Sequence, residues 1–213
     1  MKLIVGTFLS LDGVMQAPGA PDEDRDGGFD LGGWLVPYAD EDMGRFMDES
    51  IAATDAFLLG RKTYEIFAAH WPLVTDENDP IATSLNSKPK YVASRTLDKV
   101  EWNNSTLLEG DVAEEVAKLK RQPGEVLQVQ GSGELAQTLM RHDLVDEYRL
   151  LVYPVVLGKG KRLFREGNVP AALRLVDTKT TGTGVAIHTY EQAGKPEFGS
   201  FEVDRDEAFW KDS

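Results

Sequence analysis

Cysteine is absent from the 213-residue sequence. A chain without cysteine forms no disulfide and offers no thiolate to a metal, so a reducing compartment such as the cytoplasm is its expected location. No apolar run approaches the roughly 20 residues that a membrane-spanning helix needs. The N-terminal sequence MKLIVGTFLSLDG has no long apolar region followed by a small-residue cleavage site, and it predicts a first strand, not a signal peptide.

Basic residues are also scarce, because 23 Lys and Arg stand against 36 Asp and Glu and leave a net charge of −13. This balance argues against binding to nucleic acid or to an anionic membrane surface, since both need an excess of cations. A small anionic ligand would require a local basic cluster. The three histidines have no metal-ligand spacing, so we expect no metal site.

The order of apolar segments predicts an α/β fold. Strand-like segments alternate with amphipathic helical ones in the first two thirds of the chain, and strands dominate afterwards. We expect a mostly parallel central sheet with an antiparallel C-terminal edge and flanking helices. The expected strands are 2–9, 55–59, 90–94, 105–108, 125–130, 148–158, 173–181 and 184–192, and the expected helices begin near residues 40, 61, 79, 112 and 133. One domain would span 1–192, followed by an acidic tail over 193–213.

Three of the expected strand ends carry similar polar residues. They are GRKT (60–63), SRT (94–96) and GSGEL (131–135). A helix N-terminus exposes free N–H groups and a partial positive charge, glycine lets the backbone approach a ligand, and arginine binds phosphate with a planar fork. Because ligands of open α/β sheets bind at the carboxyl ends of the strands, the three ends together predict a dinucleotide site.

Ordinary nucleotide-binding motifs are missing from these segments. GRKT lacks the upstream glycine of a Walker A loop, because position 55 is Asp, so a phosphotransferase is disfavoured. The first strand is not followed by G-x-G-x-x-G. Each strand end taken alone is also compatible with a plain turn, and only their convergence favours a cofactor site.

Five segments in order resemble the dihydrofolate reductase-like family. They are SLDG (10–13), GRKTYE (60–65), VASRT (92–96), VQGSGEL (129–135) and DEYRLLVYPVVLGKGKRLF (146–164). The chain most resembles the stand-alone branch similar to the C-terminal reductase domain of the bifunctional riboflavin-biosynthesis deaminase/reductase. The zinc deaminase half of that enzyme has cysteine ligands and no counterpart here. The resemblance implies a three-layer fold, NADPH as the cofactor and a homodimer.

By this resemblance, the strand ends would hold NADPH. Ser94 and Arg95 would flank its 2′-phosphate, which Arg61 could share. The implied cofactor-binding residues are Thr7, Gly60, Arg61, Thr63, Ser94, Arg95, Gly131, Ser132, Gly133, Glu134 and Leu135.

Residues near the reacting atoms are less well defined by the sequence. Asp12 is the candidate catalytic acid after the first strand, but it is equally interpretable as a turn residue before Gly13. Phe29 and Trp34 in the long loop 16–37, and Tyr38 directly after it, could stack on a flat substrate or could anchor that loop.

The sequence therefore predicts an NADPH-dependent oxidoreductase that reduces a small heterocycle by hydride transfer. The candidate substrates are a pyrimidine, such as the phosphoribosylaminopyrimidine of the riboflavin pathway, or a pterin-like ring. The alternative is a non-catalytic NADP(H)-binding module or sensor that uses the same pocket.

Overall fold

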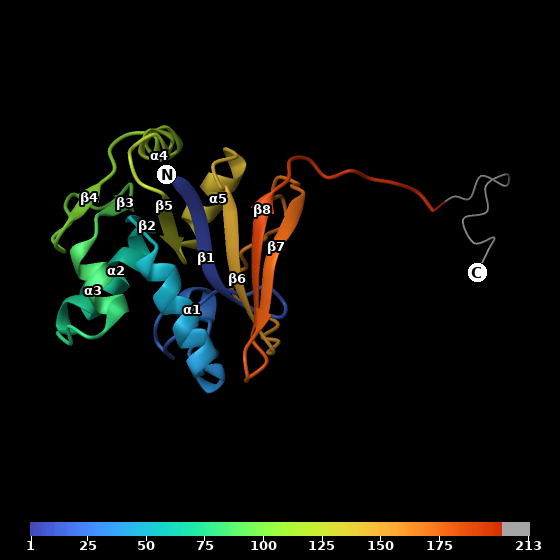
Figure 1. Ribbon diagram of the computed structural model, residues 1–213, viewed down its shortest axis with the longest axis horizontal. Helices are drawn as coiled ribbons and strands as arrows, with labels where there is room; N and C mark the ends of the chain where they lie inside the picture. The colour runs from blue at the N-terminus through green and yellow to red at the C-terminus, as the bar shows by residue number, and fades with distance from the viewer. Residues whose placement is uncertain (202–213) are drawn as a thin grey trace.

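The computed structural model of the protein describes residues 1–201, which fold around an eight-stranded sheet (Figure 1). The strand order is β4-β3-β2-β5-β1-β6-β8-β7. Neighbouring strands are parallel except that β8 runs antiparallel to both β6 and β7, which confirms the predicted sheet. The strands are β1 (Lys2–Ser10), β2 (Ala56–Gly60), β3 (Lys90–Ala93), β4 (Ser105–Leu107), β5 (Val126–Gln130), β6 (Glu147–Tyr153), β7 (Leu173–Thr180) and β8 (Ala186–Gln192).

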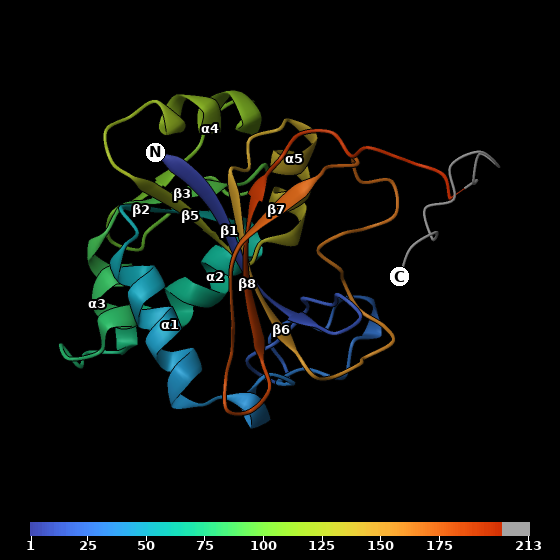
Figure 2. The same cartoon turned by 45° about the vertical axis from the view of Figure 1, so that its right-hand side comes forward.

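Helices cover both faces of this sheet and make a three-layer structure (Figures 1 and 2). The helices are α1 (Glu41–Ala52), α2 (Arg61–His70), α3 (Pro80–Ser87), α4 (Val112–Lys120) and α5 (Gly133–Arg141), with short 3-10 turns at Asp26–Gly28, Val36–Tyr38 and Trp71–Leu73. The first three helices pack on one face, and α4 and α5 pack on the other. Within residues 1–201, no helix combines the length and the apolar composition needed to cross a membrane.

Strand β1 shows how side-chain alternation separates the two faces. Leu3, Val5 and Leu9 are buried against α4 and α5 in the largest apolar cluster. Gly6 and Phe8 point to the opposite face, where α1 lies. Each fully buried leucine contributes about 1.5–3 kcal/mol by leaving water, so the burial on β1 fixes the register of the whole strand.

The predicted strand 148–158 is too long, because β6 ends at Tyr153. Residues 155–158 instead fold around the turn that follows β1, where the carbonyl of Val155 accepts a 2.8 Å hydrogen bond from the N–H of Leu11. The apolar run YPVVLG has strand composition, but Pro154 offers no backbone N–H to a sheet. Tertiary hydrogen bonds to the first loop therefore override the local strand propensity.

Lys90 on β3 is fully buried between the sheet and α3. Its ammonium group donates to the carbonyls of Leu85 and Lys88 at 2.6 and 2.9 Å and lies 4.4 Å from the centre of the Trp102 ring. Burial disfavours the charged form and lowers the pKa of Lys90 to about 8 from 10.5. The buried charge is partly compensated by these carbonyls and the aromatic face.

We expect Lys90 to make the free energy of unfolding depend on pH. Between pH 8 and 10.5 the unfolded chain holds a proton on Lys90 that the folded chain has lost, so stability from this group rises with pH across that window. The gain over the whole window is about 3 kcal/mol. Urea unfolding of the wild type and Lys90→Met at several pH values measures the difference, and two parallel pH profiles would contradict the expectation.

Candidate functional site

The carboxyl ends of β2 and β5 meet through Ser132. The hydroxyl of Ser132 accepts a hydrogen bond from the N–H of Gly60 at 2.8 Å and donates to Oγ1 of Thr63 at 2.8 Å. A Cβ on residue 60 would lie 3.2 Å from both side-chain atoms of Ser132, a tight contact, so the close approach of the two strand ends favours glycine. The first and third predicted strand ends are therefore one continuous surface.

Two successive left-handed residues connect β5 to α5. Gly131 has φ of 56° and Ser132 has φ of 59°. A left-handed serine is uncommon, and its conformation is held here by its hydrogen bonds to Gly60 and Thr63. The turn presents the first N–H groups of α5 beside those of α2.

These two helices begin without a side-chain cap, unlike the three other α-helices. Helices α1, α3 and α4 each follow an aspartate, namely Asp40, Asp79 or Asp111, whose carboxylate accepts from first-turn N–H groups. Neither Gly60 before α2 nor Ser132 before α5 caps its helix through a side chain. Open N–H groups and the positive ends of two helix dipoles therefore face the same surface, which suits an anion such as a pyrophosphate.

The third strand end, after β3, lies next to β2 on the same edge of the sheet. The hydroxyl of Ser94 accepts hydrogen bonds from the N–H groups of Thr96 and Leu97 at 3.1 and 3.0 Å, so it organises the loop. Arg95 is exposed and makes no hydrogen bond or ion pair with any residue of 1–201. Arg61, by contrast, pairs with Glu65 at 3.1 Å on its own helix. Arg95 is thus the more available cation.

Other predicted cofactor residues differ in what they can contact. Gly133 opens α5 close to Met15 and Arg165, because a Cβ there would lie 3.3 Å from an atom of each. Glu134 pairs with Arg165 at the surface. Leu135 is buried in the core between α5 and the sheet, so only its backbone can reach a ligand. Thr7 is buried on β1 and alternates with Gly6 and Phe8, so it lines the pocket on the α1 face through its backbone.

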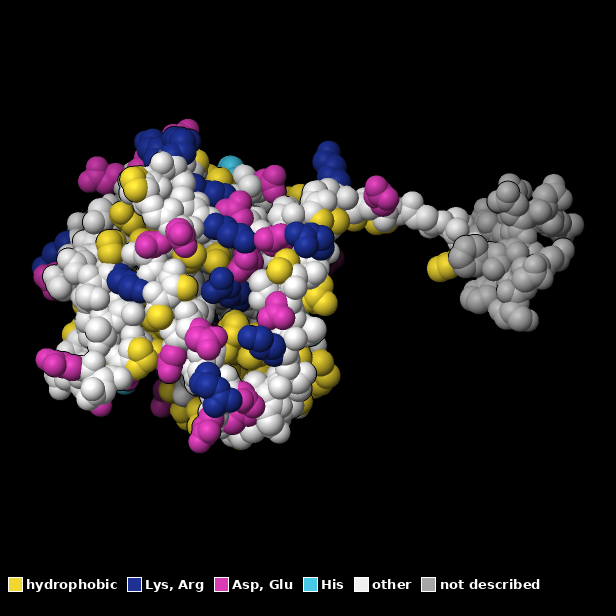
Figure 3. Space-filling view, in the orientation of Figure 1, with side chains coloured by type: hydrophobic (Ala, Val, Ile, Leu, Met, Phe, Trp, Pro, Cys, Tyr) yellow, Lys and Arg dark blue, Asp and Glu magenta, His cyan; other side chains and the backbone are white. Residues whose placement is uncertain are grey.

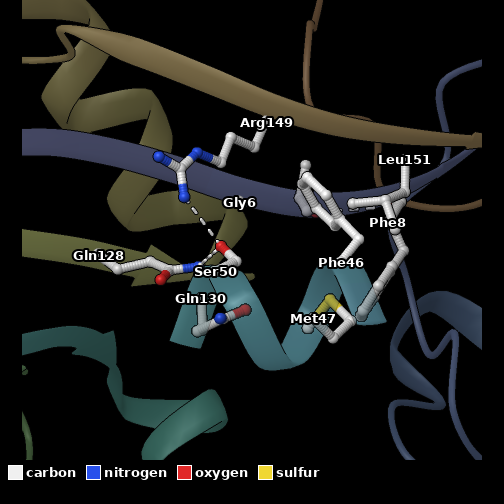
Figure 4. Close-up of a pocket in the computed structure, with 10 residues that line it drawn as sticks. Gly6, Phe8, Phe46, Met47, Ser50, Gln128, Gln130, Arg149 and Leu151 are labelled. Carbon is white, nitrogen blue, oxygen red and sulfur yellow. Dashed lines mark hydrogen bonds between the residues drawn. The ribbon is translucent and has the colours of Figure 1, made fainter. Parts of the chain in front are cut away.

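This pocket lies between α1 and the sheet and has two chemically different ends (Figure 4). At one end the side chains of Phe8, Phe46, Met47 and Leu151 make apolar walls. At the other end polar side chains gather from two strands and the helix, namely Gln128 and Gln130 of β5, Arg149 of β6 and Ser50 of α1. Because Gln130 directly precedes Gly131, the pocket adjoins the surface between α2 and α5. A ring bound in the pocket would lie beside a ligand bound on that surface.

Asp12 has a structural environment that argues against its predicted catalytic role. Its carboxylate accepts hydrogen bonds from Ser10 Oγ at 2.7 Å and from the N–H groups of Leu157 and Gly158 at 3.0 and 2.9 Å, and it pairs with Arg162 at 3.2 Å. Partial burial raises the pKa of Asp12, but the hydrogen bonds from Leu157, Ser10 and Gly158 outweigh it and hold that pKa well below the usual range. A carboxylate that stays ionised and accepts four donors organises the loop, so the turn interpretation of Asp12 is favoured.

The aromatic residues of loop 16–37 anchor that loop. Phe29 and Trp34 are 3% and 7% exposed. The indole N–H of Trp34 donates to the carbonyl of Gln16 at 2.8 Å, and its ring packs edge-on against Tyr153 with centroids 5.4 Å apart. Tyr38 packs against the same Tyr153 ring at 6.1 Å. Of the two predicted roles, the geometry favours anchoring over stacking on a substrate.

Loop 16–37 is also tied down by charge. Lys62 in the first turn of α2 and Lys161 after β6 both pair with Asp24 and Asp26. Both lysines thus have acidic partners from one segment of the loop, although their side chains stay partly exposed. The pairs hold the loop across the start of α2, beside the surface formed by the strand ends.

Comparison with known proteins assigns the family. The family model of the RibD C-terminal domain matches residues 1–187. The chain belongs to this family. It is similar to the uncharacterized protein YyaP of Bacillus subtilis strain 168, with 32% identity over 195 residues that cover 91% of this chain and 96% of YyaP.

Solved structures confirm the dihydrofolate reductase-like fold predicted from the sequence. A putative riboflavin biosynthesis protein from Shewanella sp. PV-4 superposes with a TM-score of 0.67 at 24% identity, covering 90% of this chain and 99% of that one. Dihydrofolate reductase from Enterococcus faecalis, complexed with NADP(H) and RAB-propyl, gives a TM-score of 0.57 at 15% identity, with 90% of this chain and 96% of that one covered. A deaminase/5-amino-6-(5-phosphoribosylamino)uracil reductase from Thermotoga maritima gives 0.60 at 13% identity, and the match covers 90% of this chain and 56% of that protein.

In this RibD-family chain, the sequence interpretation missed most of the pocket residues. Gln128 and Gln130 alternate with buried apolar residues in the strand VLQVQ, and Ser50 shares a helix face with Phe46 and Met47. Two glutamines on one face of a central strand are a usable signal, because buried amides need partners. Arg149 gave no comparable signal, since a single arginine in a predicted strand near the sheet edge is usually solvated.

Proposed function

We propose that the protein is an NADPH-dependent reductase of a small heterocyclic substrate. The observation that carries this proposal is the pair of helix N-termini, of α2 and α5, that lack a side-chain cap and are joined through Ser132. Gly60 precedes α2, and Gly133 is the first residue of α5. Such a surface binds a pyrophosphate through backbone N–H groups with little help from cations. This arrangement explains how a chain with a net charge of −13 can bind a highly anionic cofactor.

The residues around this surface fit the remaining parts of the cofactor. The N–H groups at the start of α2 and α5 would hold the pyrophosphate, with Thr63 and Ser132 as hydroxyl partners. Arg95 and the hydroxyl of Ser94 would bind the adenosine 2′-phosphate. Thr7 would lie near the nicotinamide, because it lines the pocket next to Gln130. NADPH, when bound, supplies the hydride.

The pocket under α1 would bind the substrate. Its apolar walls, formed by Phe8, Phe46, Met47 and Leu151, would contact the faces of a flat ring and its polar end the ring edge. The pocket has a volume of about 10 Å³ in this structure, so these side chains would have to move apart to admit the ring. Leu151 is buried and Phe8, Phe46 and Met47 are half-buried, so a ring held between them would be partly shielded from water, which favours hydride transfer. The names of the similar solved proteins support a pyrimidine or pterin-like ring as the substrate class.

Cofactor preference tests the cation assignment. We expect Arg95→Ala to weaken NADPH binding about 10- to 100-fold, because a charge-assisted hydrogen bond to phosphate contributes about 1.5–3 kcal/mol. NADH, which lacks the 2′-phosphate, should bind the variant as it binds the wild type. Arg61→Ala is the matched control, with a smaller loss because Arg61 already pairs with Glu65. Isothermal titration measures all four affinities, and an equal loss of NADPH and NADH in Arg95→Ala would remove Arg95 from the phosphate site.

Turnover tests the reductase itself. NADPH oxidation is followed by absorbance with a panel of oxidised pyrimidines, dihydropterins and quinones, and oxidation that depends on both enzyme and substrate supports the proposal. NADPH binding without oxidation of any panel member would favour the non-catalytic NADP(H)-binding module. No binding of NADPH would contradict both.

A further inference from the structure

Loop 16–37 and helix α1 border the apolar end of the pocket. The four apolar residues that line this end belong to one cluster with Phe29 and Trp34 of the loop. Because the cofactor would lie beside the polar end, a side chain carried by a bound ring would leave past the loop and the helix. The charge of these two elements therefore bears on which substituents the substrate can carry.

This border of the pocket is strongly acidic. Residues 16–52 contain ten Asp and Glu against two Arg, which is more than half of the net charge of −13. Both arginines already pair with neighbouring carboxylates, Arg25 with Asp22 and Arg45 with Asp42. Figure 3 shows acidic side chains along α1, in the lower middle of the view. An anionic substituent would meet a repulsive field here.

The segment after β6 is the basic neighbour of this border. It carries four cations within residues 159–165, and four cations so close together would bind an anion if they were free. Each of them is paired with a carboxylate of the protein itself, namely Lys159 with Asp30, Lys161 with Asp24 and Asp26, Arg162 with Asp12, and Arg165 with Glu134. The protein's own acids thus take the place that a phosphate of the substrate would need.

A buried glutamine fixes the acidic loop to this basic segment. Gln16 is 4% exposed, and its Nε2 donates to the carbonyls of Asp24 and Asp26, both at 3.0 Å. Its Oε1 accepts from the N–H of Lys161 at 3.0 Å. The two carboxylates are therefore placed through the backbone, and not only by surface ion pairs, which contribute little on their own. Hydrogen bonds from Lys161 and Lys62 lower the pKa of Asp26 to about 2, so it stays ionised at neutral pH.

We propose that the substrate of this protein carries no phosphate group. A phosphate on the side chain of the bound ring would face the carboxylates of the loop and would have to break the ion pairs of segment 159–165 to find a cation. The inference rests on the proposed reductase function and narrows its substrate to unphosphorylated heterocycles. It separates this chain from the Thermotoga maritima reductase, whose name specifies a phosphoribosyl substrate.

The anionic cofactor would avoid this acidic border. Its pyrophosphate would bind at the start of α2 and α5, which lack a side-chain cap, and its 2′-phosphate would bind at Arg95. Arg95 has no acidic partner within residues 1–201. The same edge of the sheet thus combines a region open to phosphate with one that is closed to it.

Matched pairs of ligands test the inference. Neopterin and neopterin 3′-phosphate differ by the phosphate alone, as do 5-amino-6-ribitylaminouracil and its 5′-phosphate. We expect the full-length protein, with and without NADP⁺, to bind the unphosphorylated member of at least one pair at least tenfold more tightly at low ionic strength. Salt at about 0.5 M should narrow the difference severalfold, because it shortens the Debye length from about 10 Å at 0.1 M. Equal affinities, tighter binding of the phosphates, or no binding of either unphosphorylated ring would overturn the proposal.

Charge-neutralising variants assign the selection to the loop. Asp24→Asn/Asp26→Asn leaves both paired lysines free and should raise the affinity for the phosphorylated ring about tenfold, with less than a twofold change for the unphosphorylated one. Asp30→Asn removes a single exposed ion pair, so it should fold normally and give a gain of about threefold. Glu114→Gln/Asp177→Asn is the control, because it removes two exposed charges on α4 and β7. Equal gains in the control, or no gain in either loop variant, would contradict the role of the loop.

The same samples separate this inference from the proposed function. NADPH binding uses the surface at α2 and α5 and is measured alongside the ligand pairs. If NADPH fails to bind while the preference for the unphosphorylated ring holds, the reductase proposal fails and the charge selection stands. If NADPH binds and the phosphorylated ring binds as tightly as its partner, the charge selection alone is wrong.

Discussion

Gly131→Val is expected to weaken NADPH binding about 100-fold or more. Gly131 has φ of 56°, a conformation that strongly disfavours β-branched residues, and a Cβ there would lie 3.7 Å from Thr63 Oγ1, in the space between α2 and α5. The added methyl groups would occupy the place of the pyrophosphate and displace the first N–H groups of α5. Loss of two charge-assisted backbone hydrogen bonds at about 1.5–3 kcal/mol each accounts for this magnitude. Isothermal titration with NADPH gives the affinity.

Gly194→Val is the matched control for backbone strain. Gly194 has φ of 90°, and nothing lies within 4 Å of a Cβ built there. It follows β8, which is antiparallel to β6 and therefore ends away from the carboxyl ends of the parallel strands. This variant should lose stability but bind NADPH within about twofold of the wild type. Equal losses of NADPH affinity in both variants would show that Gly131 acts through general stability and that the surface at α2 and α5 is not the cofactor site.

Asp12→Ala is expected to lower the free energy of unfolding by about 3 kcal/mol. The substitution leaves the N–H groups of Leu157 and Gly158, the hydroxyl of Ser10 and the guanidinium of Arg162 without their shared acceptor. A protein of this size should lose roughly 6–12 °C in Tm, which calorimetry or urea unfolding measures. Because the pKa of Asp12 lies below 3.8 in the folded state, its contribution is complete at neutral pH and is lost as the pH falls through the acid range.

Asp177→Asn serves as the control for Asp12, because Asp177 is exposed on β7 and pairs only loosely with Lys179 at 3.9 Å. It should change stability by less than about 0.5 kcal/mol. The contrast separates the two interpretations of Asp12. A catalytic acid would give an Asp12→Ala protein of near-normal stability with a large loss of turnover, and that outcome would contradict the structural role assigned here.

The sequence predicted the elements of the fold well where local signals agree with tertiary structure. Strands such as AFLLG on β2 are apolar because both faces are buried, and the change from strand to helix at Gly60 is marked by glycine itself. The prediction was wrong at residues 154–158, which lie outside the sheet. The carboxylate of Asp12 accepts hydrogen bonds from the N–H groups of this segment, and the N–H of Leu11 donates to one of its carbonyls. A local sequence pattern cannot predict a hydrogen bond between residues that are 145 positions apart.

The candidate site was predictable only in part, for the same reason. Gly60, Thr63 and Ser132 share glycine and hydroxyl chemistry at predicted strand ends, and the structure brings them together. The pocket under α1 depends on residues from β1, β5, β6 and α1, whose common face exists only after the register of the sheet is set. The ion pairs of Lys62 could not be predicted from the sequence, because its partners, Asp24 and Asp26, lie in a loop without periodicity.

A crystal structure with NADPH bound is the most direct test of the central claim, that the chain binds this cofactor across the carboxyl ends of β2 and β5. The pyrophosphate should lie within hydrogen-bonding distance of the N–H groups that open α2 and α5. The 2′-phosphate should contact Arg95, and the nicotinamide should lie beside Thr7 at the mouth of the pocket under α1. NADPH bound elsewhere, for example in the groove lined by Tyr64, Leu97 and Trp102, would contradict the account.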